Sequence, residues 1–582
     1  MLKILRHLTR REWLFVGVSL VFIIMQVWLD LKLPDYMAEV TLLIQTEGTT
    51  VSDLWHPGLM MLLCAVISMV AAIIVGCFAA RIAAGLAKRI RGMVFDKTIS
   101  FSLAEMNHFS TPSLITRSTN DITQIQMIVA MGLQVIIKAP ILAVWAIIKI
   151  YNKNLEWTAA TGVVLLLLVT LILILVLVAI PKFKVIQTLT DNLNRITREN
   201  LTGLRVIRAY NAEDYQLRKF EKANTEVTST NLFVNRIMAL ISPSMMLLMS
   251  GLSVAIYWIG AYLIQNANAV DKLPLFSNMV VFSSYAMQVI MAFMMVSMIF
   301  IMLPRAQVSA KRILEVLNTS STINDGEHAI EGSIEEIQFN NVSFRYPNSE
   351  QNVLTNLQFT AKKGETIALI GSTGSGKTTA IQLIPRFFDV TEGEVLINGQ
   401  NIKKFNQKAL RDAIGYVSQS AFLFRGTVKS NVMYGSKEDR SMWLQEVISI
   451  AQGTEFVEKM ENSYDAMIAQ GGKNVSGGQK QRLSIARAIY KKPSIYLFDD
   501  SFSALDYETD RKLRSALKET TNDAITFIVA QRIGTIKEAD RILVFDQGRI
   551  VGNGTHDELM VNCETYQEIA YSQLSKEELE HA

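Results

Sequence analysis

The chain has 582 residues, of which 50% are hydrophobic and 19% are charged, and this length accommodates roughly two to four domains. Its formal net charge of +4 is small, so the charge gives no ground for a nucleic-acid partner. Cys64, Cys77 and Cys563 show neither disulfide nor metal-ligand spacing, and we interpret them as inert thiols. The apolar residues are concentrated in the first half, in runs long enough to cross a bilayer.

The first half is predicted to be a membrane domain. Residues 1–12 are basic and amphipathic, which predicts an interfacial elbow helix. A cleaved signal peptide is the alternative, but the long apolar run that follows shows no convincing cleavage site. Spans of suitable length for helices across hydrocarbon lie at about 13–33, 59–80, 125–148, 158–181, 239–264 and 277–303. We therefore predict a transmembrane domain over residues 13–317.

The connections between these spans alternate in charge. The N-terminus and the connections after the second and fourth spans are rich in Lys and Arg, whereas the loop 34–58 has neither and the loop 265–276 has only Lys272. Because cytoplasmic loops carry the excess of positive charge, this pattern places both termini in the cytoplasm. The long basic connections are predicted to be helical extensions of the spans.

Three features of the membrane half have two interpretations each. Segments 109–117 and 199–210 mix turn residues with apolar ones, which suits docking onto a soluble domain; solvated turns are the alternative. Lys138 lies inside the third span, where a cation is a functional candidate. We favour the alternative that its ammonium group snorkels to the interface or faces a cavity.

A polar linker at 318–332 precedes a region, 333–582, with the composition of a soluble α/β domain. Within it, the apolar run 367–370 predicts a buried strand, and residues 371–378 fit the phosphate-loop pattern G-x-x-x-x-G-K-[ST]. In such a loop, backbone N–H groups cradle phosphates. Lys377 is predicted to reach the β- and γ-phosphates, and Thr378 is predicted to hold Mg²⁺.

Further motifs support a nucleotide site. The apolar strand 494–500 ends in two acids, and Asp499 fits the carboxylate that organises Mg²⁺ in phosphate-loop ATPases. Ser476 to Gln479 open a helix, where a hydroxyl group and unpaired N–H groups form an anion site. Since the domain has one phosphate loop, this second device is predicted to serve a nucleotide held by another copy of the domain. Tyr346 is a candidate to stack on an adenine base, although Tyr beside Pro is also common in turns.

With these motifs in place, the chain resembles the ATP-binding cassette (ABC) exporters over its whole length. The resemblance implies an α-helical transmembrane domain with long cytoplasmic extensions, fused to an α/β P-loop nucleotide-binding domain. It also implies an ATPase coupled to transport, with ATP and Mg²⁺ as cofactors. The functional unit would be a dimer that holds two ATP molecules between the phosphate loop of one chain and the signature of the other.

The resemblance assigns roles to individual residues. The residues implied to contact ATP are Tyr346, Gly371, Ser372, Thr373, Gly374, Ser375, Gly376, Lys377, Thr378 and Thr379. The signature that faces the partner's nucleotide would be Ser476, Gly477, Gly478 and Gln479. The Mg²⁺ ligands would be Thr378, Gln419 of the Q-loop and Asp499, and Ser503–Asp506 matches the D-loop. Segments 109–117 and 199–210 resemble the coupling regions.

Two departures from the family pattern affect catalysis. Asp500 stands where the family has the Glu that polarises the attacking water, and Gln531 stands where it has the switch His. The carboxylate of Asp is one methylene shorter, and a misplacement of about 1 Å can cost roughly 10²-fold in rate. Gln cannot carry a proton as imidazole does. Together these changes predict slow or absent hydrolysis of the ATP on this chain's phosphate loop. A smaller departure is Gln470, where many relatives have Glu.

This combination resembles the degenerate-site (EfrC/LmrC-type) subunit of bacterial heterodimeric multidrug exporters. That resemblance implies export of small amphipathic or hydrophobic compounds across the plasma membrane, together with a second half-transporter. The alternatives are a slow homodimer with two Asp500 sites, a lipid or peptide exporter, and an ATP-gated channel or sensor.

Overall fold

The fold is described from a computed structural model over residues 2–46, 48–151, 154–347, 349–436 and 441–573. Contacts within the chain divide it into two units: Met1–Ile99 with Pro112–Thr319, and Ser100–Thr111 with Ser320–Ala582. We call these the membrane unit and the soluble unit and describe each by itself. Residues 574–582, the end of the domain expected at 333–582, lie outside the described residues.

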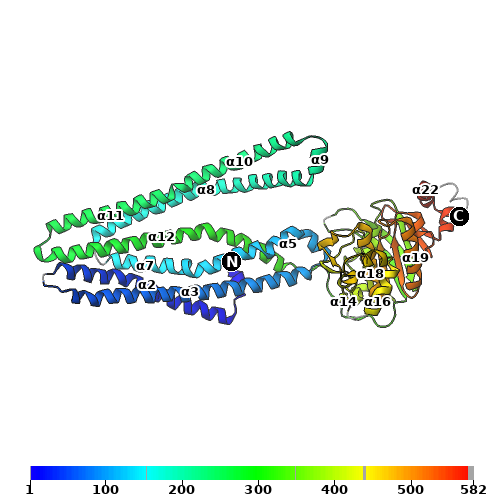
Figure 1. The fold of residues 1–582 in the computed structure, drawn as a ribbon, viewed down its shortest axis with the longest axis horizontal. Coiled ribbons are helices and arrows are strands. Elements are labelled where there is room, and N and C mark those ends of the chain that lie inside the picture. The colour runs from blue at the N-terminus through cyan, green and yellow to red at the C-terminus, as the bar shows by residue number, and fades with distance from the viewer. Residues whose placement is uncertain (1, 47, 152–153, 348, 437–440, 574–582) are drawn as a thin grey trace. The chain divides into compact units, whose positions relative to one another are not determined.

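The membrane unit is built of helices, drawn in blue to green in Figure 1. Their bounds are α1 Leu2–Leu5, α2 Arg10–Gln45, α3 Val51–Ile99, α5 Thr111–Ser118, α6 Asn120–Met131, the π-helix η1 Gly132–Ile137, α7 Lys138–Tyr151, α8 Leu155–Thr202, α9 Leu204–Ala209, α10 Glu213–Ala239, α11 Ile241–Asn266 and α12 Ala269–Asn318. Among the described residues, 6 stretches are long and apolar enough to cross a membrane, which confirms the predicted number of spans.

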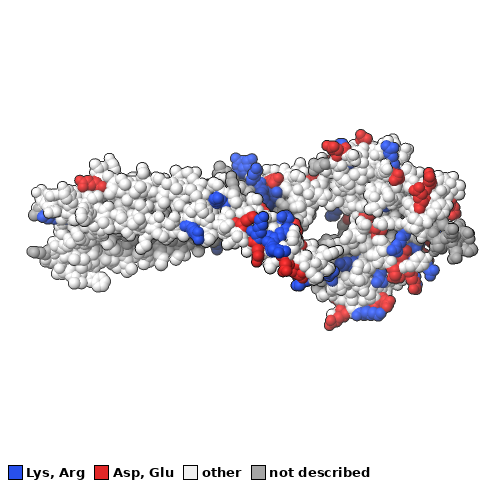
Figure 2. All heavy atoms as spheres, turned by 90° about the horizontal axis from the view of Figure 1, so that it is seen from above, with Lys and Arg blue, Asp and Glu red and all other residues white. Residues whose placement is uncertain are grey.

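Several helices continue well beyond a membrane-spanning length. α3 has 49 residues and α8 has 48, whereas about 20 residues cross the hydrocarbon. The basic connections are therefore helical extensions, as expected. α8 and α10 run side by side and are joined at one end by α9 (Figure 1). On the face shown in Figure 2, the helices carry few charges along most of their length, and charged side chains gather toward one end.

A polar network joins α2, α7 and α12 inside the membrane unit. Pro34 lies within α2 and has no N–H group to offer the carbonyl oxygen of Asp30, four residues earlier. The side-chain amide of Gln288 on α12 donates to that oxygen at 3.1 Å. The ammonium group of Lys138 on α7 lies 3.1 Å from the Asp30 carboxylate, and the Lys138 side chain is 18% exposed. This cation is paired with a carboxylate inside the membrane unit, a partner that the sequence did not predict.

The soluble unit contains two main sheets. Their strands are β1 Glu336–Phe344, β2 Leu354–Lys362, β3 Thr366–Gly371, β4 Glu392–Ile397, β5 Gln400–Asn401, β6 Ile414–Val417, β9 Ile495–Asp499, β10 Ile525–Val529, β11 Arg541–Asp546 and β12 Arg549–Gly554. The first sheet has the order β2-β1-β4-β5 and the second β12-β11-β3-β10-β9-β6. In the second, β12 pairs antiparallel at one edge and the other pairings are parallel.

Helices cover this second sheet, and two hydrophobic cores use alternate residues of its strands. The helices are α4 Leu103–Phe109, α13 Lys377–Leu383, α14 Gln407–Asp412, α15 Val428–Val432, α16 Ser441–Ile450, α17 Thr454–Glu458, α18 Gly477–Tyr490, α19 Tyr507–Thr520, α20 Ile533–Ile536, α21 His556–Asn562 and α22 Glu564–Gln573; a small pair, β7 Gly426–Thr427 and β8 Met467–Ile468, completes the unit. Phe498 of β9 packs in one core and Leu497 in the other, as expected for a strand buried on both faces.

Two segments near the expected domain boundary pack within the soluble unit. The linker is held there, because Asp325 accepts hydrogen bonds from the Asn406 side chain at 2.9 Å and from the Gln407 N–H at 2.7 Å. Residues 100–111, which the sequence assigns to the membrane domain, also belong to this unit. The Glu105 carboxylate accepts from the N–H of Thr322 at 3.1 Å. By these contacts, residues 100–111 and residues 320–332 of the expected linker belong to the soluble unit.

Candidate nucleotide-binding site

The phosphate loop follows β3, a central strand with β11 on one side and β10 on the other. Gly371, Gly374 and Gly376 have φ values of 150°, 84° and 99°, which L side chains rarely adopt. A Cβ atom on Gly371 would also lie 2.0 Å from the carbonyl oxygen of Phe545. Glycine is therefore required at this position by both conformation and space. α13 begins directly after the loop, at Lys377.

Lys377 folds back over the loop. Its Nζ atom donates to the carbonyl oxygens of Gly371 and Ser372 at 2.9 and 2.8 Å. Burial lowers the pKa of Lys377, whereas the negative charges of Asp500 and Asp499 raise it. A desolvated ammonium group is suited to bind an anion. The position therefore fits the predicted role toward phosphates.

Thr378 and Asp499 lie together, as predicted. The Thr378 hydroxyl donates to Asp499 Oδ1 at 2.7 Å. Asp499 is 2% exposed, and burial raises its pKa. A hydroxyl and a carboxylate oxygen side by side are ligands that Mg²⁺ accepts, and Mg²⁺ usually takes its remaining ligands from phosphates and water. The residues therefore fit Mg²⁺. Within the described residues, no group of three or more His, Cys, Asp or Glu side chains forms another candidate metal site.

Asp500 is bonded by two side-chain amides. Its Oδ2 atom accepts from Nε2 of Gln531 at 2.9 Å and from Nε2 of Gln419 at 3.2 Å. The three residues meet because β9 has β10 and β6 as parallel neighbours, with Val529 paired to Asp499 and Val417 paired to Phe498. Asp500, Gln531 and Gln419 follow the ends of these three strands. The structure thus brings together the two departures from the family pattern and the predicted Q-loop residue. Both donors are amides, so neither can accept a proton from a water molecule.

Tyr346 lies beside α13. Its hydroxyl group is 2.9 Å from Oγ1 of Thr379, another residue implied to contact ATP. The ring packs edge-on against Phe344 and Phe388, with centroid distances of 4.9 and 5.2 Å. These contacts fix the orientation of the half-buried ring next to the helix that follows the phosphate loop.

The signature residues cap the start of α18. Oγ of Ser476 accepts from the N–H of Gln479 at 3.3 Å, and Oε1 of Gln479 accepts from the N–H of Ser476 at 2.9 Å. Ser476 and Gly477 are exposed. A Cβ atom on Gly478 would lie 3.1 Å from the carbonyl oxygen of Ala504, so the signature packs closely on the segment that matches the D-loop. These hydrogen bonds remain within the capping box, and among the described residues no hydrogen bond joins the signature to the phosphate loop of the same chain.

Gln573, the last residue of α22, was missed by the sequence analysis. Its side chain bonds the backbone of the segment that follows β10, where Gln531 lies. No motif contains Gln573, and it is separated from Gln531 by 42 positions. Only the fold places the two together.

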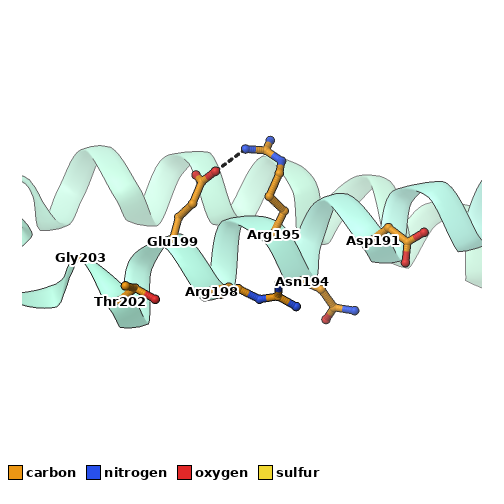
Figure 3. Close-up of a pocket in the computed structure, with 7 residues that line it drawn as sticks. All are labelled: Asp191, Asn194, Arg195, Arg198, Glu199, Thr202 and Gly203. Carbon is orange, nitrogen blue, oxygen red and sulfur yellow. Dashed lines mark hydrogen bonds and ion pairs between the residues drawn. The ribbon is translucent and has the colours of Figure 1, made fainter. Parts of the chain in front are cut away.

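The expected coupling segment 199–210 includes the short helix α9 and the end of α8. A cavity of about 690 Å³ lies there, and it is lined by Asp191, Asn194, Arg195, Arg198, Glu199, Thr202 and Gly203 (Figure 3). Arg195 and Glu199 lie on one side of α8 and form an ion pair of 2.6 Å, while Lys219 of α10 lies 3.1 Å from Glu199. Leu204, Val206 and Tyr210 are 51%, 61% and 79% exposed. Ion pairs therefore connect the end of α8 with α10, and the segment beyond it presents an apolar surface. Docking of this segment onto a soluble domain stays a prediction.

Comparison with known proteins shows two family models that match the chain. Residues 354–503 match the model of the ABC transporter family, and residues 16–293 match the model of the ABC transporter transmembrane region. An uncharacterised ABC transporter ATP-binding protein of Mycobacterium tuberculosis is 38% identical over 85% of this chain and 84% of its own length. The uncharacterised ABC transporter ATP-binding protein YfiB of Bacillus subtilis is 33% identical over 97% of both chains.

Two further comparisons concern fold and cargo. An ATP-dependent lipid A-core flippase of Aromatoleum aromaticum is 29% identical over 83% of this chain and 79% of its own length. The solved structure of a bacterial Atm1-family ABC exporter with ATP bound superposes with a TM-score of 0.80 at 22% identity, covering 96% of this chain and 98% of that one. The folds of the two proteins are therefore the same.

Proposed function

Because the chain belongs to the ABC transporter family, we propose that it is the degenerate-site half of a heterodimeric exporter that carries small amphipathic or hydrophobic compounds across the plasma membrane. The family and the spans make it a multi-pass membrane protein whose ATPase domain is coupled to transport. Half-transporters of this kind act as dimers. The proposal adds a different partner chain, export as the direction and the class of cargo.

The observation that carries the proposal is the bonding of Asp500. Its carboxylate oxygen is held by the amides of Gln531 and Gln419 at 2.9 and 3.2 Å. A carboxylate that polarises a water molecule must come within hydrogen-bond reach of it and accept its proton. Here the Asp500 side chain is one methylene shorter than that of Glu, and the groups that donate to its carboxylate are amides. We therefore assign this site the retention of ATP rather than its rapid hydrolysis.

The exposed signature of this chain is assigned to the second site, where ATP is hydrolysed. Ser476 and Gly477 are exposed at the start of α18, a helix of 14 residues, where the N-terminal end of the helix favours an anion. Placed against the phosphate loop of the partner, this signature would complete a site that is competent for ATP hydrolysis. Hydrolysis would then take place mainly on the partner's phosphate loop.

The transport cycle follows from this arrangement. The soluble domains of the two chains close on bound nucleotide, the coupling segments transmit the closure, and the membrane helices open outward. A ligand shifts such an equilibrium only by its differential affinity for the two states. We propose the boundaries 1–12, 13–317, 318–332 and 333–582 for the elbow helix, membrane domain, linker and nucleotide-binding domain, with both termini and the last domain in the cytoplasm.

A lipid cargo is the second candidate. It is favoured by the relative that is named as a lipid A-core flippase. Accumulation of an amphipathic dye in inverted vesicles that contain both chains would support a multidrug cargo. Transfer of a labelled lipid between leaflets, without accumulation of dye, would support the lipid cargo.

ATPase measurements test the degenerate site. The chain should be purified alone and together with its presumed partner, a half-transporter with Glu and His at the positions of Asp500 and Gln531. We expect little turnover by the chain alone and robust turnover by the pair. Robust turnover by the chain alone that is abolished by Asp500→Asn would show a homodimer with working sites and would refute the proposal.

A further inference from the structure

The C-terminal helix α22 ends beside the loop that carries Gln531. The side-chain oxygen of Gln573 accepts from the N–H of Ile533 at 2.9 Å, and its side-chain nitrogen donates to the carbonyl oxygen of Gln531 at 2.8 Å. Both partners are backbone groups, so the two bonds depend on the path of the loop and not on its side chains. One planar amide thus spans the loop at two points, and we call this contact the Gln573 brace.

Gln573 supplies hydrogen bonds that the loop itself does not provide. It leads from β10 into α20, a helix of 4 residues whose N-cap residue, Arg532, makes no side-chain capping bond. The first N–H groups of a helix have no partner within the helix. Gln573 supplies the missing acceptor to Ile533, the first residue of α20. Without it, a short helix start and the preceding peptide groups would depend on water for their hydrogen bonds.

The brace is anchored firmly at its other end. Tyr566 and Ala570 of α22 are buried in the same hydrophobic core as Ile533 and Ile536 of α20. The two helices are therefore packed together on their inner faces. Gln573 extends from the end of this packed pair, so its amide has a defined place from which to hold the loop.

The brace leads directly to the nucleotide site. Gln531 is held through its carbonyl oxygen by Gln573, and its side-chain amide donates to Asp500 Oδ2 at 2.9 Å. We propose that Gln573 is a positioning residue for the nucleotide site: it fixes the backbone at residue 531 so that the Gln531 amide faces Asp500 and the terminal phosphate. This inference rests on the proposed assignment of Asp500 and Gln531.

The position of the brace predicts which nucleotide it affects. Among the described residues, Gln573 bonds Ile533 and Gln531 and neither Tyr346, which is assigned to the base, nor the phosphate loop, whose Lys377 is predicted to reach both the β- and the γ-phosphate. Residues 500 and 531 are assigned to the side of the terminal phosphate, which ADP lacks. Loss of the brace should therefore weaken ATP binding and leave ADP binding unchanged, whereas general damage to the fold would weaken both.

The test is photolabelling of the full-length chain in its assembled transporter with radioactive 8-azido-ATP. The labelled chain is separated by electrophoresis and quantified, with unlabelled ATP or ADP as competitor. For Gln573→Ala we expect the half-maximal concentration of ATP to rise about fivefold, as for the loss of one or two net hydrogen bonds, and that of ADP to stay within about twofold. Gln567→Ala is the matched control, because Gln567 lies on the same helix and bonds Met560 and Val561.

A second variant distinguishes loss of the brace from a folding defect. Gln573→Glu keeps an acceptor for the N–H of Ile533 and removes the donor to the carbonyl oxygen of Gln531. It should retain the thermal stability of the parent chain and still show the selective loss of ATP. An unchanged ratio of ATP to ADP affinity in both variants would overturn the brace, as would an equal loss for both nucleotides.

These outcomes are distinct from failure of the proposed function. Rapid turnover by this chain alone would refute the degenerate site but not the brace. The brace would then act on a working site, and the ratio of ATP affinity to ADP affinity would still measure its effect. Absence of labelling in the parent chain would refute nucleotide binding at this site, and the brace with it.

Discussion

Asp500 and Gln531 form a hydrogen-bonded pair in which a carboxylate accepts from an amide. The amide of Gln531 donates to the Asp500 carboxylate at 2.9 Å. A histidine at position 531 would be able to take up a proton near neutral pH. The two residues therefore contact each other directly, and a substitution of one changes the hydrogen-bond partner of the other.

This coupling predicts that activity returns only when both residues are changed. Asp500→Glu restores the missing methylene, and Gln531→His restores a group that exchanges protons. We expect the double variant to raise the ATPase rate of the chain in the absence of its partner by roughly tenfold to a hundredfold, with much smaller effects of the single changes. Steady-state phosphate release measures this.

The control for this variant separates chemistry from improved folding. Asp500→Gln together with Gln531→His has nearly the same size but no carboxylate, so it should remain inactive. Equal rates in the two double variants would contradict the assignment of Asp500 to catalysis.

At the scale of elements, the membrane unit is held by polar contacts around Pro34 of α2. Pro34 leaves the carbonyl oxygen of Asp30 without its helical partner, and Gln288 donates to it at 3.1 Å. One turn further along α2, Asp35 lies 2.7 Å from the ammonium group of Lys149. Polar and ionised groups in a membrane helix are costly unless paired, so these contacts stabilise one arrangement of α2, α7 and α12.

The ion pair between Asp30 and Lys138 should therefore show strong coupling. Asp30→Asn or Lys138→Met alone leaves one charged partner behind, and each should destabilise the protein by about 1–2 kcal/mol. The double variant should lose less than the sum of the single losses. Thermal unfolding of the purified protein in detergent measures this. Glu508→Gln breaks an ion pair whose side chains are 70% and 56% exposed, and it should change stability very little; additive losses at residues 30 and 138 would contradict the coupling.

Local patterns predicted the elements well where the physical cause is local. Apolar runs of membrane length predicted the spans, and the glycine spacing predicted the loop before α13. Asp499 and Thr378 were both predicted to serve Mg²⁺ beside the phosphate loop, and they meet because β9 and β3 lie in one parallel sheet with only β10 between them. Pairing of Lys138 with Asp30 depends instead on the packing of α7 against α2, which are separated by 108 positions at these residues. The brace by Gln573 likewise depends on how α22 packs, and the sequence carries no periodic signal for either contact.

At the scale of the whole molecule, the chain combines a complete phosphate loop with a site assigned to slow hydrolysis. Lys377, Thr378 and Asp499 have the contacts expected of a nucleotide site, whereas Asp500 is bonded by amides. In the proposed dimer, one composite site would use this phosphate loop and the partner's signature. The other would use the partner's phosphate loop and Ser476 to Gln479 of this chain. The same chain thus contributes unequally to the two sites.

This inequality predicts unequal effects of the same substitution in the two chains. Lys377→Ala removes the ammonium group that is held at 2.9 Å over the loop, and it should weaken retention of ATP at the degenerate site while transport falls only severalfold. The matching change in the partner removes the competent site and should lower transport by about 10²-fold or more. Substitution of Ser476 by Arg in this chain should resemble the change in the partner, because it obstructs the competent site from the opposite side. Transport of dye into inverted vesicles, measured for each variant at equal protein content, gives the comparison. Equal losses from the two lysine substitutions would show two equivalent sites, and the division of roles between the chains would then be wrong.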